Sequence, residues 1–216
     1  MMKTSDDQMR DVPAFQQQGI ELILKSLQES KESVEILSFG SARPVAAAFN
    51  REPKLIFKKV RRIHLSAGSC EPGFLEWNVL LDPKAIVCLL RSRLPIAIYP
   101  CGTKDGAFAY GAHNTFWKLA DLRFIGEMKS PLRGYLAYAL SRSKRTDFLR
   151  AVEEDPPADL MQAIINKPHN VWETSLWMNV SGRKLVKRAD GHYRIIAASE
   201  VRSGDEVLPN NLRACR

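Results

Sequence analysis

Strand-like and helix-like segments alternate through the first hundred residues of this 216-residue chain. Short apolar runs at 34–39, 62–66 and 94–99 are separated by segments with helical periodicity at 44–50 and 82–91. Strands that alternate with helices at this spacing are typical of βαβ units, whose strands are parallel. Because such crossovers are right-handed, the loops after the three strands lie at one edge of the sheet. The pattern therefore predicts an α/β fold with a parallel sheet and flanking helices.

Three further segments show helical periodicity. Apolar residues recur at helical spacing over 15–29, before the first strand, and again over 130–149. A shorter helix is predicted at Asp159–Ile165, with that aspartate as its N-cap residue. Asp82 and Pro83 give the helix after the second strand the same kind of start, because proline suits the first helical position.

The C-terminal part of the chain is predicted to be antiparallel. Asp190-Gly191 lies between strand-like runs at 184–187 and 192–196, and this dipeptide between two such runs is a strong hairpin signal. We found no internal repeat. The predicted organisation is a single domain over 1–216, with a sheet core at 14–100, a helical part at 101–168 and a hairpin region at 169–216.

Composition narrows the classes of protein to consider. Hydrophobic residues make up 45% and charged residues 26%, which excludes a disordered or collagen-like chain. The four cysteines form no C-x-x-C pair, which excludes a zinc knuckle and a thioredoxin-type redox pair. There is no apolar stretch of about 18 residues and no signal-peptide core at the N-terminus, so we expect a cytoplasmic protein without membrane contact.

The formal net charge of +8 raises the question of nucleic-acid binding. The two densest basic clusters lie at 58–62 and 142–145, and neither is interleaved with aromatic residues. No finger, RNP-type or KH-type motif accompanies them. We therefore interpret both clusters as solvated positive faces, and nucleic-acid binding ranks below the alternatives that follow.

The loop at 69–78 carries the first candidate site residues. Glu76 and Asn78 are two residues apart, so in extended backbone they point to one face, while Trp77 points the other way. A carboxylate beside a carboxamide can hold a vicinal diol, because Glu accepts and Asn both donates and accepts. The alternative is that Glu76 faces solvent and Asn78 forms a turn.

Histidines supply the next candidates. His169 precedes an apolar aromatic stretch and could act as a general acid, although a lone histidine is often structural. His64 lies inside a predicted strand and is interpreted as a core or edge residue. The chain contains no G-x-G-x-x-G, P-loop, G-x-S-x-G or H-E-x-x-H motif, so phosphate-loop, serine-hydrolase and zincin chemistry have no support.

An ordered set of motifs resembles the inosine-uridine-preferring nucleoside hydrolases. Gly40–Ala48 followed by Arg51–Pro53 resembles the segment after their second sheet unit, and Ile63–Gly68 resembles their next strand and its glycine. Glu76-Trp77-Asn78 followed by Asp82-Pro83 resembles their E-F-N…D-P motif. The match covers about 34–100 and returns weakly at His169-Asn170, which resembles a His-Asp pair.

The resemblance implies hydrolysis of the N-glycosidic bond of ribonucleosides, with calcium holding the ribose diol and a nucleophilic water. It implies that Glu76 and Asn78 bind the ribose and that His169 protonates the departing base. It also implies that the backbone carbonyl of Phe39 is a calcium ligand, because hard oxygen ligands suit that ion. Asn170 stands where the family has a calcium-binding aspartate, so it is at most a weak ligand.

The chain also departs from the family pattern. It contains no D-x-D-x-x-x-D-D motif, which is the main calcium-binding motif of that family, and Asp6-Asp7 is a poor substitute for it. Cys70 stands where the family has a ribose-contacting asparagine. With fewer anionic ligands, calcium should bind weakly. The expected function is therefore nucleoside hydrolysis by an impaired enzyme, and the alternative is a non-catalytic relative that binds a nucleoside or sugar.

The expected partner is a small-molecule nucleoside, and we also expect association of the chain with itself. If the first strand of the family fold is missing, the strand at 34–39 has an uncovered edge. An open apolar edge favours association. The segment at 15–29 could instead fold across that edge and leave a monomer.

Overall fold

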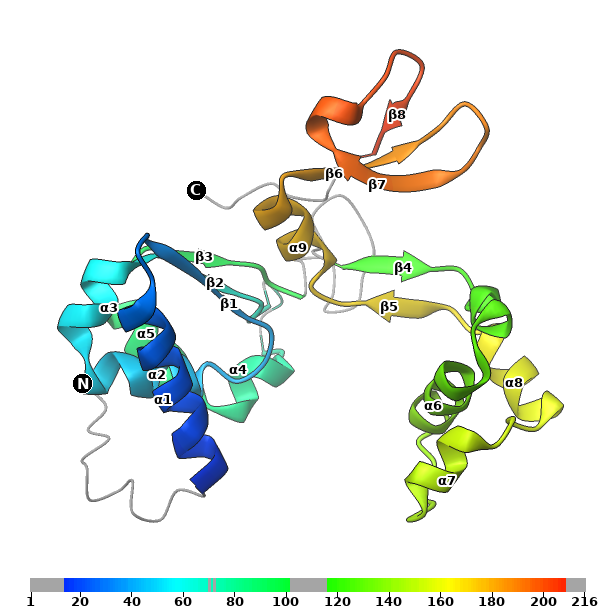
Figure 1. Ribbon diagram of the computed structural model, residues 1–216, viewed down its shortest axis with the longest axis horizontal. Helices are drawn as coiled ribbons and strands as arrows, with labels where there is room; N and C mark the ends of the chain where they lie inside the picture. Colours follow the sequence, from blue (N-terminus) through cyan, green and yellow to red (C-terminus); the bar gives the residue numbers. More distant parts are fainter. Residues whose placement is uncertain (1–13, 70, 72, 102–115, 209–216) are drawn as a thin grey trace. The chain divides into compact units, whose positions relative to one another are not determined.

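The computed structural model describes residues 14–69, 71, 73–101 and 116–208 (Figure 1). Contacts divide the chain into two compact units. Unit 1 comprises the residues up to Phe116 together with those from Trp172 onward, and unit 2 comprises Trp117–Val171. No helix in the described ranges is long and apolar enough to cross a membrane. The prediction of one domain over the whole chain stays a prediction.

A parallel three-stranded sheet organises unit 1, as the sequence predicts (Figure 1). Its strands are β1 (Val34–Ser38), β2 (Val60–Leu65) and β3 (Ile96–Ile98). The order is β1-β2-β3, and both neighbouring pairs are parallel. Ile63 of the central strand pairs with Ile36 and Ile96 and is fully buried. Among the described residues, β1 and β3 are therefore the edge strands.

Five helices accompany this sheet: α1 (Ala14–Glu29), α2 (Arg43–Arg51), α3 (Pro53–Lys59), α4 (Trp77–Leu81) and α5 (Pro83–Arg91). Ile20 and Leu27 of α1 belong to the same buried cluster as Ile56 of α3 and Leu89 of α5. The predicted cap of α5 is confirmed, because the Asp82 side chain accepts from the Ala85 N–H at 3.1 Å. The sequence prediction missed α3, which begins at Pro53, a residue type that suits the first helical position.

The C-terminal part of unit 1 contains a helix and a small antiparallel sheet. Its elements are α9 (Thr174–Ser181), β6 (Arg183–Lys187), β7 (Tyr193–Ala197), the 3-10 helix η3 (Ala198–Glu200) and β8 (Glu206–Val207). The predicted hairpin is confirmed as the β6–β7 pair. Gly191 lies in its turn with a φ of +82°, a conformation that glycine adopts without steric cost. β8 adds a third strand beside β6.

Unit 2 is a helical unit with a two-stranded antiparallel sheet. Its elements are β4 (Trp117–Leu119), η2 (Arg123–Glu127), α6 (Ser130–Leu140), α7 (Phe148–Glu153), α8 (Ala158–Ile165) and β5 (His169–Val171). The continuous helix predicted at 130–149 is wrong, because the chain leaves α6 after Leu140 and Arg142 takes a left-handed φ of 53°. The predicted cap of α8 is also wrong: Pro157 is the N-cap residue, and Asp159 lies in the first turn.

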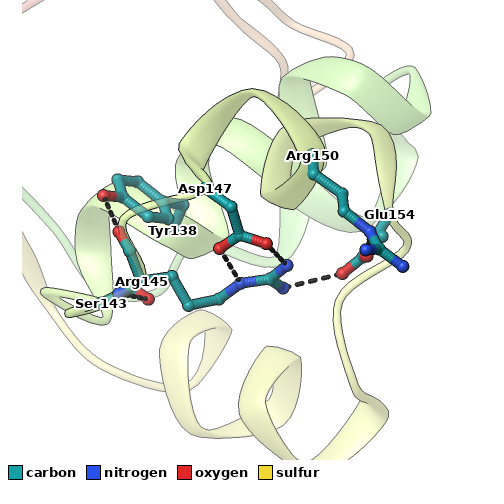
Figure 2. Close-up of polar contacts among 6 residues, drawn as sticks. All are labelled: Tyr138, Ser143, Arg145, Asp147, Arg150 and Glu154. Carbon is teal, nitrogen blue, oxygen red and sulfur yellow. Dashed lines mark hydrogen bonds and ion pairs between the residues drawn. The ribbon is translucent and has the colours of Figure 1, made fainter.

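Arg145 organises the connection between α6 and α7 (Figure 2). Its guanidinium donates to Asp147 at 2.7 Å and to Glu154 at 2.7 Å. Glu154 also accepts from Arg150 at 3.0 Å, and the Tyr138 hydroxyl donates to the Arg145 carbonyl at 2.9 Å. The basic cluster at 142–145 is therefore partly neutralised by carboxylates and is not a purely positive face.

Replacing Arg145 by glutamine should raise the pKa of Asp147. Hydrogen bonds from Arg145 hold that pKa at about 2, and without them it should move toward its ordinary value of 3.8. Because the pKa of Asp147 is lower in the folded state, its contacts with Arg145 stabilise the folded state above pH 4. This stabilisation is lost as the pH falls toward 2. Carboxyl-carbon NMR titration measures the shift. Arg123→Gln, which removes the partner of Asp121, is the control; an unchanged Asp147 titration in Arg145→Gln would contradict the assignment.

Candidate functional site

A cavity of about 250 Å³ lies at the carboxyl edge of the parallel sheet in unit 1. We call it the Glu76 pocket, and its lining residues are Ser66, Phe74, Glu76, Trp77, Asn78, Cys101, Trp172 and Glu173. Ser66 directly follows β2, and Cys101 comes three residues after β3. Open α/β sheets bind ligands at this edge. The structure thus brings together the predicted site residues Glu76 and Asn78.

Glu76 is the N-cap residue of α4 and is only 6% exposed. Its Oε1 accepts from the Asn78 N–H at 2.8 Å, and its Oε2 accepts from the Val79 N–H at 3.1 Å. Oε2 also accepts from the Gly68 N–H at 2.9 Å, in the loop after β2. A carboxylate has about four acceptor sites. Three of these acceptor sites bind the backbone N–H groups of the loop and the helix, so about one acceptor site remains for a ligand.

The Asn78 side chain joins the ends of two strands. Its Nδ2 donates to the Ser66 carbonyl at 2.7 Å, after β2, and to the Phe39 carbonyl at 3.4 Å, after β1. Both hydrogens of the side-chain amide are therefore donated to backbone carbonyl groups. The carbonyl Oδ1 is the atom of this side chain that is left to contact a ligand, and it can only accept.

The sequence argument for this pair assumed extended backbone, and that assumption is wrong. α4 begins at Trp77, so the two side chains meet because Glu76 turns back to cap the helix that carries Asn78. The expectation that Trp77 points away from them is also wrong, because Trp77 lines the same pocket. The cap explains the pairing: an acidic N-cap side chain folds over the first turn to reach the free N–H groups there.

Glu173 is a pocket residue that the sequence analysis missed. It precedes α9 with a φ of 61°, a left-handed conformation that is uncommon outside glycine. Its Oε1 accepts from the Ser66 hydroxyl at 3.4 Å. Burial raises the pKa of Glu173, and the charge of Glu76 adds to this effect. Backbone strain of this kind often occurs at functional sites, but no sequence motif predicted the conformation of Glu173.

Cys101 lies in the same electrostatic environment. Burial, followed by the charge of Glu76, raises the pKa of its thiol to about 11. The thiol is therefore protonated at neutral pH and is a poor nucleophile. Cys101 is better suited to packing against a ligand than to reacting with one.

His64 is a buried core histidine, as the sequence interpretation holds. It is 2% exposed, and its Nδ1 lies 2.9 Å from the Tyr99 hydroxyl. The same hydroxyl accepts from Asn179 Nδ2 at 2.6 Å, so the contact fixes α9 against β2 and β3. Burial lowers the pKa of His64, which favours the neutral ring in this network. The network holds the helix that begins next to Glu173.

His169 and Asn170 lie in β5 of unit 2, where they pair with Leu119 and Lys118. His169 is exposed. The expectation that these two residues share a site with Glu76 stays a prediction. Cys70, which the resemblance places beside the ribose, falls outside the described residues.

The pocket does not fit a calcium ion. Calcium takes about six to eight oxygen ligands, preferably several carboxylates. The oxygens of Glu76 face three backbone N–H donors, whose positive ends would also face the cation. The Phe39 carbonyl, expected as a ligand, lies next to the amide nitrogen of Asn78. Within the described ranges, no cluster of three or more His, Cys, Asp or Glu residues could hold a metal.

We expect calcium to bind weakly or not at all, with a dissociation constant above about 1 mM. Isothermal titration calorimetry of the whole chain with calcium chloride measures this constant. Melting temperatures in calcium and in EGTA should be the same, because a bound ion would stabilise the folded state. Micromolar binding would contradict the prediction.

Three comparisons place the chain among known proteins. No family model matches it. Pyrimidine-specific ribonucleoside hydrolases RihA from Escherichia coli O127:H6 (strain E2348/69 / EPEC) and from Enterobacter sp. (strain 638) are each 34% identical to it over 93 residues. The match covers 40% of this chain, 30% of the first relative and 29% of the second.

Among solved structures, the chain is similar to an inosine-uridine preferring nucleoside hydrolase from Bacillus anthracis. The TM-score is 0.42 at 16% identity, over 85% of this chain and 58% of that one. The chain thus spans about a third of the length of the curated relatives that it matches. The predicted resemblance is confirmed at the level of sequence: over 93 residues, this chain is similar to ribonucleoside hydrolases.

Proposed function

We propose that this chain is a nucleoside hydrolase-like protein that binds a ribonucleoside in the Glu76 pocket. One observation carries the proposal: Glu76 and Asn78, whose side chains both contain acceptor oxygens, line a 250 Å³ pocket together with three aromatic residues. A ribose diol can donate one hydrogen bond to each acceptor. The aromatic faces of Phe74, Trp77 and Trp172 suit a nucleobase. The similarity to ribonucleoside hydrolases supports the same substrate class.

Hydrolysis of the N-glycosidic bond is the second candidate function, and Glu173 favours it. In this reaction a water adds to C1′ of the ribose, and the base leaves after it gains a proton. A carboxyl group with a raised pKa can keep that proton at a higher pH than an ordinary glutamate. The resemblance assigns the same role to His169. Both assignments belong to the proposal.

Binding is tested by titrating the full chain with uridine and inosine and following tryptophan fluorescence. We expect 2′-deoxyuridine to bind about tenfold more weakly than uridine, because it lacks one hydroxyl of the diol. Trp77→Ala should weaken uridine binding by about tenfold, since stacking on an aromatic ring contributes about 1–3 kcal/mol. Trp77 is 67% exposed, so the variant should fold.

Trp177→Ala is the matched control. Trp177 is also exposed, at 55%, but it stacks on Phe39 and does not line the pocket. Its replacement should leave uridine affinity unchanged within about threefold. Absence of binding at millimolar nucleoside, or equal losses in the two tryptophan variants, would refute the proposed site.

Release of free base, followed by chromatography, tests the second candidate in the same samples. If Glu173 donates the proton, Glu173→Gln should abolish turnover and leave uridine affinity within about threefold of the wild type. Turnover should fall as the pH rises through the raised pKa of Glu173, because the carboxyl group then loses its proton. Turnover lost only in His169→Gln would assign the acid to that histidine instead. Binding without any turnover would leave a nucleoside-binding protein.

A further inference from the structure

A groove with a volume of about 620 Å³ lies on the helical side of unit 1. We call it the α5 groove, because α5 supplies half of its lining residues. It shares no lining residue with the Glu76 pocket. Phe57 of α3 is 51% exposed there, and Val87 of α5 is 44% exposed. Apolar lining residues are Phe49, Pro53, Phe57, Pro83, Val87 and Cys88.

All charged residues that line this groove are basic: Lys84, Arg91 and Arg93. In the part of the chain that the structure describes, none of the three pairs with a carboxylate. Other arginines of unit 1 do pair, as Arg43 does with Asp82 and Arg61 with Glu35. The groove therefore combines an apolar floor with uncompensated positive charge.

The three cations are unevenly placed along the groove. Lys84 lies in the first turn of α5, and Arg91 is its last residue, about 10 Å further along the axis. Arg93 follows two residues later, with a left-handed φ of 65° at a position that usually favours glycine. One end of the groove thus carries two positive charges, and the apolar residue Val87 of α5 lies between that end and Lys84.

We propose that the α5 groove binds an apolar carboxylate, a ligand with one anionic head and an aliphatic chain. The head lies at Arg91 and Arg93, and the chain runs over Val87 and Phe57 toward Pro83. The volume lies in the range of small-molecule sites, which are mostly apolar with a few polar groups that fix orientation. An acidic helix in the groove would instead use Lys84 and Arg91 equally, because they lie two turns apart on one helix.

Dodecanoate, below its micelle concentration, is the probe for the full chain in isothermal titration calorimetry. We expect one site, with dodecyltrimethylammonium at least about tenfold weaker, because it has the same chain and the opposite charge. Arg91→Gln/Arg93→Gln should weaken dodecanoate binding by about five- to tenfold. Lys84→Gln should change it less than about twofold. Val87→Asp should weaken it by more than about tenfold, because it places a negative charge in the apolar floor.

All four substituted residues are exposed, so the variants should fold, and circular dichroism checks this. Uridine affinity should be unchanged in every variant, which separates this proposal from that for the Glu76 pocket.

The proposal would be overturned if the two detergent-like probes bound equally well. It would also be overturned if dodecanoate did not bind at 1 mM, which is about the limit of weak specific affinity. An equal loss in Lys84→Gln and the double arginine variant would also overturn it and would indicate an acidic peptide. Concentration-dependent dimerisation abolished by Val87→Asp, without dodecanoate binding, would overturn it in favour of a second copy of the chain.

Discussion

Replacing Glu76 by alanine should lower the free energy of unfolding by about 3 kcal/mol and abolish nucleoside binding. The substitution removes the acceptor of the N–H groups of Gly68, Asn78 and Val79. Each buried N–H left without a partner costs about 1–3 kcal/mol, although water that enters the pocket recovers part of this. Loss of the N-cap also frays α4, which carries Asn78. The stability loss and the binding loss therefore have one cause.

Urea denaturation followed by circular dichroism measures the stability change, and uridine titration measures the binding change. Glu76→Gln keeps one side-chain acceptor oxygen, so its loss of stability should be about half as large. Glu21→Ala, on the exposed face of α1, should stay within about 0.5 kcal/mol of the wild type. If Glu76→Ala unfolds at the wild-type urea concentration, the three hydrogen bonds do not hold the loop.

Replacing Gly134 by alanine should destabilise unit 2 by about 2 kcal/mol. Gly134 lies buried in α6, where an added Cβ would stand 2.7 Å from the Val152 carbonyl oxygen and 3.1 Å from that of Glu154. Alanine in a helix normally gains about 1 kcal/mol over glycine. The clash outweighs this gain, because both oxygens belong to the backbone and cannot rotate away, so α6 and α7 must move apart.

Gly19→Ala is the matched control, because Gly19 lies in α1 with no heavy atom within 4 Å of an added Cβ. It should stabilise the protein by about 0.5–1 kcal/mol through reduced freedom of the unfolded chain. Hydrogen exchange of amides in α6 and α7 localises the effect of Gly134→Ala to unit 2. A gain of stability in both variants would show that α6 and α7 are not packed this closely.

The sequence by itself determined the elements whose causes are local. The alternation of apolar runs and helical periodicity predicted the parallel arrangement of β1, β2 and β3, because crossover connections join parallel strands. Asp82 with Pro83 marked the start of α5, and Asp190 with Gly191 marked the β6–β7 turn. In these cases the residues that decide the structure lie within a few positions of one another, so the pattern alone contains the physical reason.

Only the tertiary structure decided the composition of the candidate site. Glu76 reaches back eight residues to the Gly68 N–H, and Glu173 meets Ser66 across 107 residues of chain. These contacts arise when the chain folds back and buries polar groups, which must then find partners. Which groups meet depends on the path of the whole chain, and periodicity, caps and turns do not encode that path.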